Sequence, residues 1–193
     1  DLDAVEAIAK YGDDAIEVIT KYGDDALEAI SKDIDPDLIK RLDDLGVKPS
    51  DYDNFKIVGR ESAEVFDFQV NRMKALGTTN SDELFAAGKK AAEIIEESGL
   101  TAQKFEDIIS TPKSLRPDPT TYLDPSYISK HLSQFDNGGS YVLTRDAYEK
   151  FINGASVLGY PDNSLFIAPK DFVDEVIKNA NGDLSILEQR FGF

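Results

Sequence analysis

The sequence contains no cysteine and no tryptophan, and it has a single histidine and a single methionine. Without cysteine, the chain has no disulfide, no thiol nucleophile and no cysteine-ligated zinc site. Because His131 is the one imidazole, sites that need two histidines, including the usual zinc hydrolase layouts, are excluded. No apolar run approaches the roughly 18 residues of a membrane span and no signal peptide is recognisable, so no membrane partner is expected. Since the chain begins at Asp1 rather than at methionine, we expect it to be part of a longer protein.

Positive charge is scarce as well. Lys and Arg number 21 against 37 Asp and Glu, which gives a formal net charge of −16 and a pI near 4.4. Nucleic-acid binding needs clustered Lys and Arg against the phosphates, so no nucleic-acid partner is expected. Docking on anionic lipid is disfavoured for the same reason. With 193 residues, of which 41% are apolar, the chain suits one large globular domain or two small ones.

An internal repeat with a period of 11 opens the chain. Residues 3–13 read DAVEAIAKYGD, residues 14–24 read DAIEVITKYGD and residues 25–35 read DALEAISKDID. Each copy begins with Asp followed three residues later by Glu, which predicts a helix capped by the Asp: Asp3/Glu6, Asp14/Glu17 and Asp25/Glu28. The Lys-Tyr-Gly that closes the first two copies is typical of a helix end.

Two interpretations of the repeat remain open. The first, which we favour, is a string of short helices with a bend at each Gly-Asp-Asp. The second is one long helix, because an interior glycine costs only about 1 kcal/mol. In such a helix the 11-residue period of the repeat would place its apolar residues on one stripe that drifts slowly around the helix. That stripe would comprise Val5, Ile8, Ile16, Ile19, Leu27 and Ile30.

Helices are also predicted between the repeat and residue 111. Asp35-Pro36 predicts the start of a helix that ends at Gly46, and Ser50 or Asp51 can start a short helix that ends at Gly59. Further helices are expected over 60–76, over 82–98 with Ser81 as its cap, and over 102–110 with Thr101 as its cap. Residues 1–111 are therefore interpreted as one helical region. The proline-rich residues 112–124 are interpreted as an extended linker.

Residues 125–193 have a mixed pattern. Helices are predicted from Pro125 to about Phe135, over 145–152, after Pro169 and after Asp183. The segments 140–144 (SYVLT) and 164–168 (SLFIA) read as two short strands lying side by side. The expected fold is mainly α, with helices over the first two-thirds of the chain and a small α+β segment with a two-stranded sheet after them.

No metal site is expected. The alternating Asp33, Asp35 and Asp37 resemble a calcium loop, but Leu38 stands where that loop needs glycine, and Asp35 is better explained as the cap of the next helix. Asn179-x-Asn181-Gly-Asp183 is a weak metal pattern and a strong pattern for a helix end followed by a cap. No cofactor is predicted either.

Four residues of the C-terminal segment are candidates for catalysis. His131 lies one helical turn from Tyr127 and from Phe135, where a packed or surface imidazole is the simpler interpretation and a general acid/base is the functional one. Ser140 follows two glycines that predict a tight turn more strongly than a phosphate loop. Tyr141 is a candidate stacking residue or a rim residue of the sheet, and Arg145 is a candidate anion contact.

The chain resembles bacterial polymorphic toxins. KYGDDAIEVITKYGDDALEAISK is similar to the helical repeats that precede their toxin domains. Residues 110–151, then GYPDNSLFIAPKDFVDEVI and NGDLSILEQRFGF, resemble the start of a C-terminal toxin domain. The resemblance implies a secreted weapon of interbacterial competition that a cognate immunity protein neutralises. Such relatives continue past the position of Phe193, which leaves open whether the catalytic set is complete, and the resemblance assigns no catalytic residue.

Three functions therefore stay open. The main one is a fragment of a secreted antibacterial toxin, delivered into a target cell and acting, if it is catalytic, on a nucleotide such as NAD or on a protein rather than on nucleic acid. The second is a non-catalytic helical interaction module. The third is an acidic mimic of nucleic acid, which the charge distribution disfavours, because −8 of the net charge falls in residues 1–60 alone.

Overall fold

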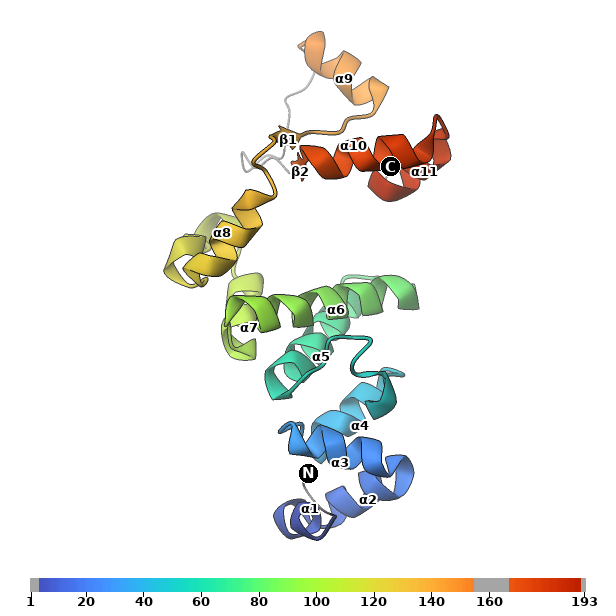
Figure 1. Cartoon of the computed structure of the whole chain (residues 1–193), viewed down its shortest axis with the longest axis vertical. Coiled ribbons are helices and arrows are strands. Elements are labelled where there is room, and N and C mark those ends of the chain that lie inside the picture. The colour runs from blue at the N-terminus through green and yellow to red at the C-terminus, as the bar shows by residue number, and fades with distance from the viewer. Residues whose placement is uncertain (1–3, 155–166, 192–193) are drawn as a thin grey trace. The chain divides into compact units, whose positions relative to one another are not determined.

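The computed structural model describes residues 4–154 and 167–191. Within them the chain is mainly helical, with eleven α-helices and one two-stranded antiparallel sheet, which confirms the predicted fold class (Figure 1). The chain divides into two compact units, residues 1–124 and residues 125–193. Most of the predicted strand 164–168 lies outside the described residues.

The repeat forms three separate helices, α1 (Ala4–Tyr11), α2 (Asp13–Tyr22) and α3 (Asp24–Ser31). The interpretation with bends is therefore confirmed. Gly12 and Gly23 lie between the helices with φ of 62° and 58° and ψ of −136° and −131°, a region that only glycine enters without strain. A continuous helix is excluded by these angles.

The predicted aspartate caps are wrong for the second and third copies. Gly12 and Gly23 are the N-cap residues, and the helices begin one residue before the expected aspartates, with no side-chain cap hydrogen bond. The Gly23 amide donates to the Ile19 carbonyl at 2.8 Å, and the Gly23 carbonyl accepts from Leu27 at 3.4 Å. One glycine thus ends a helix and begins the next. Asp13 and Asp24 occupy the first turn, where they complement the helix dipole.

The repeat lysines form a ladder of ion pairs. Each one reaches an acidic residue roughly two repeats further along the chain. The pairs are Lys10–Asp33 at 3.6 Å, Lys21–Asp43 at 2.6 Å and Lys32–Asp53 at 3.9 Å. Each pair has at least one partner that is more than half exposed, so solvent screens the attraction and the ladder contributes little to stability.

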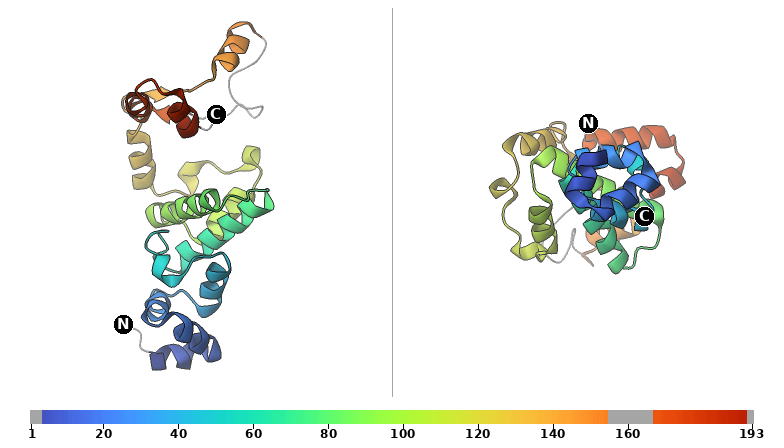
Figure 2. Two further views of the ribbon diagram at one scale, coloured as in Figure 1. Left: turned by 90° about the vertical axis from the view of Figure 1, so that its right-hand side faces the viewer. Right: turned by 90° about the horizontal axis from the view of Figure 1, so that it is seen from below.

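The helices after the repeat complete unit 1 (Figure 2). They are α4 (Pro36–Asp44), α5 (Arg60–Ala75), α6 (Ser81–Ser98) and α7 (Ala102–Ser110). The Asp35 carboxylate accepts the Leu38 amide at 2.9 Å and Thr101 caps α7, as predicted. Two predictions are wrong. Asn80, not Ser81, caps α6. A 3₁₀ turn at Pro49–Asp51 replaces the expected helix up to Gly59, since Lys56 adopts a φ of 60°, which is incompatible with a right-handed helix through this position.

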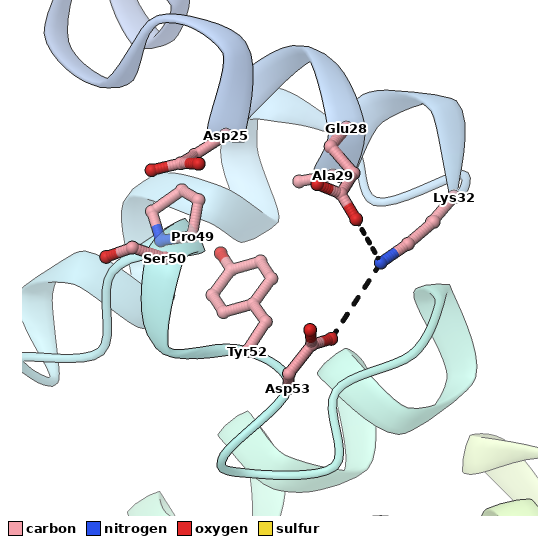
Figure 3. Close-up of a pocket in the computed structure, with 8 residues that line it drawn as sticks. All are labelled: Asp25, Glu28, Ala29, Lys32, Pro49, Ser50, Tyr52 and Asp53. Atoms are coloured by element: carbon pink, nitrogen blue, oxygen red, sulfur yellow. Dashed lines mark hydrogen bonds and ion pairs between the residues drawn. The ribbon is translucent and has the colours of Figure 1, made fainter. Parts of the chain in front are cut away.

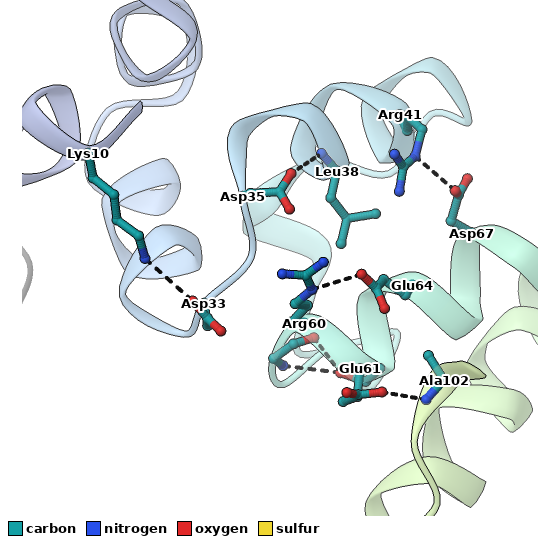
Figure 4. Close-up of polar contacts among 12 residues, drawn as sticks. Lys10, Asp33, Asp35, Leu38, Arg41, Arg60, Glu61, Glu64, Asp67 and Ala102 are labelled. Atoms are coloured by element: carbon teal, nitrogen blue, oxygen red, sulfur yellow. Dashed lines mark hydrogen bonds and ion pairs between the residues drawn. The ribbon is translucent and has the colours of Figure 1, made fainter. Parts of the chain in front are cut away.

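Polar contacts connect these helices to one another (Figure 4). The Arg41 guanidinium of α4 lies 3.0 Å from Asp67 of α5. At the start of α7, the Ala102 amide donates to the Glu61 carboxylate of α5. Glu61 therefore satisfies one of the free amides at the N-terminus of α7, at the end that the helix dipole makes positive.

Glu106 of α7 is held in an unfavourable charge environment. Burial raises the pKa of its carboxyl, and the negative charges of Glu64, Asp107 and Asp67 raise this pKa further. The folded pKa exceeds the unfolded one, so the penalty is complete at pH 7 and is relieved as the pH falls through the folded pKa.

Glu106→Gln is therefore expected to raise the free energy of unfolding at pH 7 by about 0.2–1 kcal/mol, the range for partly exposed charges. Urea unfolding at pH 7 and near pH 4 would show the gain shrinking with the pH, because the folded carboxyl is then partly protonated. Glu96→Gln, at an exposed position of α6, is the matched control and should change little. A gain that does not depend on pH would contradict the electrostatic explanation.

Residues 112–124 contain two 3₁₀ turns, Lys113–Leu115 and Pro119–Thr121, and most of their side chains are exposed. Arg116 folds this segment back on α7, since its guanidinium donates to the carbonyls of Ile109 and Thr111, both at 3.0 Å. The segment is thus tied to the last helix of unit 1.

Unit 2 contains α8 (Pro125–Ser133), α9 (Arg145–Ile152), α10 (Lys170–Ala180) and α11 (Leu184–Phe191). Strands β1 (Gly139–Ser140) and β2 (Ala168–Pro169) pair antiparallel, with Ser140 opposite Ala168. The predicted strand at 140–144 is wrong beyond Ser140, because residues 141–143 have no regular structure and Thr144 already caps α9. The sheet is consequently a single short bridge.

The packing of unit 2 is thin compared with that of unit 1. Among its described residues, the buried apolar side chains are Val173, Val176 and Ala180, all on α10. Six larger apolar side chains are half exposed or more: Leu132, Tyr148, Ile152, Ile167, Ile177 and Leu184. The described part of unit 2 therefore buries few of its apolar side chains.

Candidate binding groove

An apolar groove of about 410 Å³ lies in unit 2 where α10 and α11 meet the segment before α9. Its volume falls within the range of small-molecule sites, roughly 300–1,000 Å³. It is lined by Val142, Leu143, Thr144, Arg145, Val173, Ile177, Leu184, Leu187 and Phe191.

The sequence of α10 and α11 explains the wall of the groove. Asn181 and Gly182 adopt φ of 46° and 88° and end α10 in a tight turn. Asp183 then accepts the Ser185 amide at 2.9 Å and starts α11, which packs on α10 (Figure 1). The rings of Phe172 and Phe191 meet edge to face at 6.4 Å between centroids. The motif around Asn181 is therefore a helix end and a cap, as the sequence indicates.

Arg145 supplies the positive charge of the groove. It is the first residue of α9, and the Thr144 hydroxyl caps this helix by accepting the Ala147 amide at 3.2 Å. The Arg145 side chain is 91% exposed, and its Nε donates to Glu149 at 2.9 Å. An apolar groove with one guanidinium and one hydroxyl at its rim suits a flat apolar group that carries an anionic substituent.

His131 lies elsewhere in unit 2, on the exposed surface of α8. Its ring stacks on Tyr127 with centroids 6.5 Å apart and meets Phe135 at 5.9 Å. The two aromatic neighbours are the ones that the helical spacing indicates. This geometry is that of a surface aromatic cluster.

Ser140 is the last residue of β1, and Tyr141 follows directly after the strand. Ser140 is half-buried in β1, and Tyr141 is 37% exposed. Gly138 has a φ of 100°, and its carbonyl accepts the Lys170 amide at 2.9 Å. A Cβ at Gly139 would lie 2.8 Å from the Ile167 side chain. The two glycines are thus explained by a tight turn and a close approach of the chain.

The structure shows no direct polar contact among the four candidate catalytic residues, as far as they are described. Among the described residues, no hydrogen bond or ion pair links any two of His131, Ser140, Tyr141 and Arg145. Of the four, only Arg145 lines the groove.

Sequence reasoning missed the groove itself. The apolar residues of α10 recur at helical spacing, which by itself predicts an amphipathic helix and no groove. Val173 and Val176 are indeed buried, but Ile177 is 52% exposed. The same spacing describes both a buried stripe and the wall of a groove, so periodicity alone cannot distinguish them.

A second hollow, of about 170 Å³, lies in unit 1 between α3 and the 3₁₀ turn (Figure 3). The Lys32 ammonium stands within it, 2.7 Å from Glu28 and 3.9 Å from Asp53. Tyr52 is 4% exposed, and its hydroxyl has no hydrogen-bond partner. The hollow is smaller than most ligand sites and holds its own cation, so we assign it to the ion-pair ladder.

Comparison with protein-family models, with curated proteins and with solved structures finds no match to this chain. The functional argument therefore depends on the residues and their geometry. Within the described ranges, no helix is long and apolar enough to cross a membrane. The same ranges contain no group of three or more side chains suited to hold a metal ion.

Proposed function

We propose that the chain is part of a secreted bacterial toxin that acts in competition between bacteria. In this proposal unit 1 is the helical region that precedes the toxic part, and unit 2 contains the part that acts in the target cell. The observation that carries the proposal is the contrast between the units: a well-packed acidic helical array, and a thinly packed α+β unit with an apolar groove beside Arg145. The resemblance of the repeats supports the same division.

The chemistry of the groove favours a nucleotide or a protein segment as its ligand. An apolar wall that ends in Phe191 can pack against a flat ring, and the Arg145 guanidinium can donate hydrogen bonds to a phosphate or a carboxylate. Only six basic residues stand among residues 125–193, so a long nucleic acid is disfavoured. A cognate immunity protein would then cover this face of unit 2.

The experiment is induction of the chain in the cytoplasm of a test bacterium. The proposal predicts that growth stops and that Arg145→Ala restores growth to the level of an empty vector. Lys150→Ala is the matched control, because this residue lies on the same helix, forms an i,i+4 ion pair and does not line the groove. Circular dichroism of the purified variants checks that each one is folded.

A second candidate, a non-catalytic interaction module, is favoured by the separation of His131, Ser140, Tyr141 and Arg145. It predicts normal growth with the folded parent chain. In that outcome the toxin proposal fails for this chain, and the groove is interpreted as a surface that binds a partner without catalysing a reaction.

A further inference from the structure

The third residue of each repeat is more buried in each successive copy. Val5 of the first copy is 77% exposed and Ile16 of the second is 45% exposed. Leu27 of the third copy is half-buried and packs against the core. Three chemically similar residues at one repeat position thus lie in three different environments.

The sixth residue of each repeat follows the same order. Ile8 is 38% exposed, Ile19 is half-buried and packs against the core, and Ile30 is 3% exposed. The increase in burial therefore depends on whether a copy is the first, second or third of the three repeats, and not on a change in its sequence.

The packing of the helices explains the gradient. Helix α1 contacts α2 and α3, and α2 contacts α3 and α4, so each helix packs on the next one and on the next but one. As a result α3 has two earlier helices against it, α2 has one and α1 has none among the described residues. The ion-pair ladder has the same reach of about two repeats, as in Lys10–Asp33.

We propose that the exposed side chains of Val5, Ile8 and Ile16, here called the terminal face, bind a pair of helices of the same 11-residue repeat. The pair would stack on α1 and α2 as these helices stack on α3. Terminal units of repeat proteins normally present a polar outer face, whereas this face carries three large aliphatic side chains. The occupant would have small residues at its second and fifth positions, as in Ala26 and Ala29, which are buried. This inference does not depend on the proposed function.

The test is the full chain with a second copy of residues 3–24 inserted between Leu2 and Asp3. If the terminal face receives the added helices, the urea midpoint of unit 1 rises, and the amides of α1 exchange with solvent at least about tenfold more slowly. An insertion of 22 residues of Gly and Ser is the length control and should leave both quantities unchanged.

Val5→Lys with Ile16→Lys separates docking from a general effect of the insertion. In the original chain both positions are exposed, so the pair of substitutions should leave the midpoint unchanged. In the extended chain the same substitutions should cancel the gain, because they place two charges in the new interface. An extended chain without slower exchange, or a gain that survives both lysines, would overturn the proposal.

Discussion

Replacing Phe66 by alanine is expected to lower the free energy of unfolding of unit 1 by about 3–5 kcal/mol. Phe66 is fully buried in α5. Its ring lies 5.4 Å from the ring of Phe55 and 6.4 Å from that of Phe85, measured between centroids. Alanine would remove the apolar contacts and leave a cavity that the helices on either side cannot close. Because domains are stable by only about 5–15 kcal/mol, this one change would bring unit 1 close to unfolding.

Urea unfolding followed by circular dichroism measures the effect. The matched control is Phe172→Ala in unit 2, because that ring is 45% exposed and loses less on truncation. Equal losses at Phe66 and Phe172 would contradict the packing described for α5.

The second large effect is expected for Gly88→Val in α6. An added Cβ would lie 2.8 Å from Phe66 Cδ2, from Phe66 Cε2 and from Val70 Cγ2, closer than side chains normally approach. Both neighbours are fully buried and have no room to move. Overpacking of this kind costs about 1–3 kcal/mol, which outweighs the gain of up to about 1 kcal/mol from removing a helical glycine.

Ala86→Val serves as the control for Gly88→Val, since it makes a β-branched residue at an exposed position of the same helix. It should cost only a few tenths of a kcal/mol, roughly the difference in helix propensity. The double variant Phe66→Ala/Gly88→Val should lose less than the sum of the two single losses, because the valine then occupies space that the ring has left. Strict additivity would show that the two positions do not share that space.

The boundaries of the helices could be predicted from single residues. Gly12, Gly23 and Gly99 stand where helices end, and each has a positive φ in the structure. The cap residues were harder to predict. Gly12 and Gly23 satisfy the helix ends with their backbone alone, so the neighbouring aspartates are not required as caps.

The packing of the array could not be predicted in the same way. The repeat has large aliphatic residues at its third and sixth positions, and sequence reasoning placed these positions on one stripe. In the second copy, for example, the structure buries the second and fifth positions, Ala15 and Val18, and leaves the third position, Ile16, exposed. Which side of a short amphipathic helix is covered depends on neighbours about two repeats away, and a local pattern does not contain that information.

The candidate site was predictable only in part. Arg145 was predicted as an anion contact, and it lines the groove. The groove is made by residues as far apart as Val142 and Phe191, which α10 and α11 bring together. The ring of His131 meets those of Tyr127, on its own helix, and Phe135, in the turn after it.

The short reach of the helices in the array has a consequence for how it is made. Helices α1 and α2 each pack on the two helices that follow them in the chain. Each lysine of the ion-pair ladder can form its pair once about two more repeats have left the ribosome. Folding can therefore keep pace with synthesis, at roughly 5–20 residues per second, without waiting for unit 2. For the same reason the repeat helices can unfold one at a time, starting from α1. If the chain were pulled through a narrow pore, unfolding would then cross a series of small free-energy barriers instead of one large barrier.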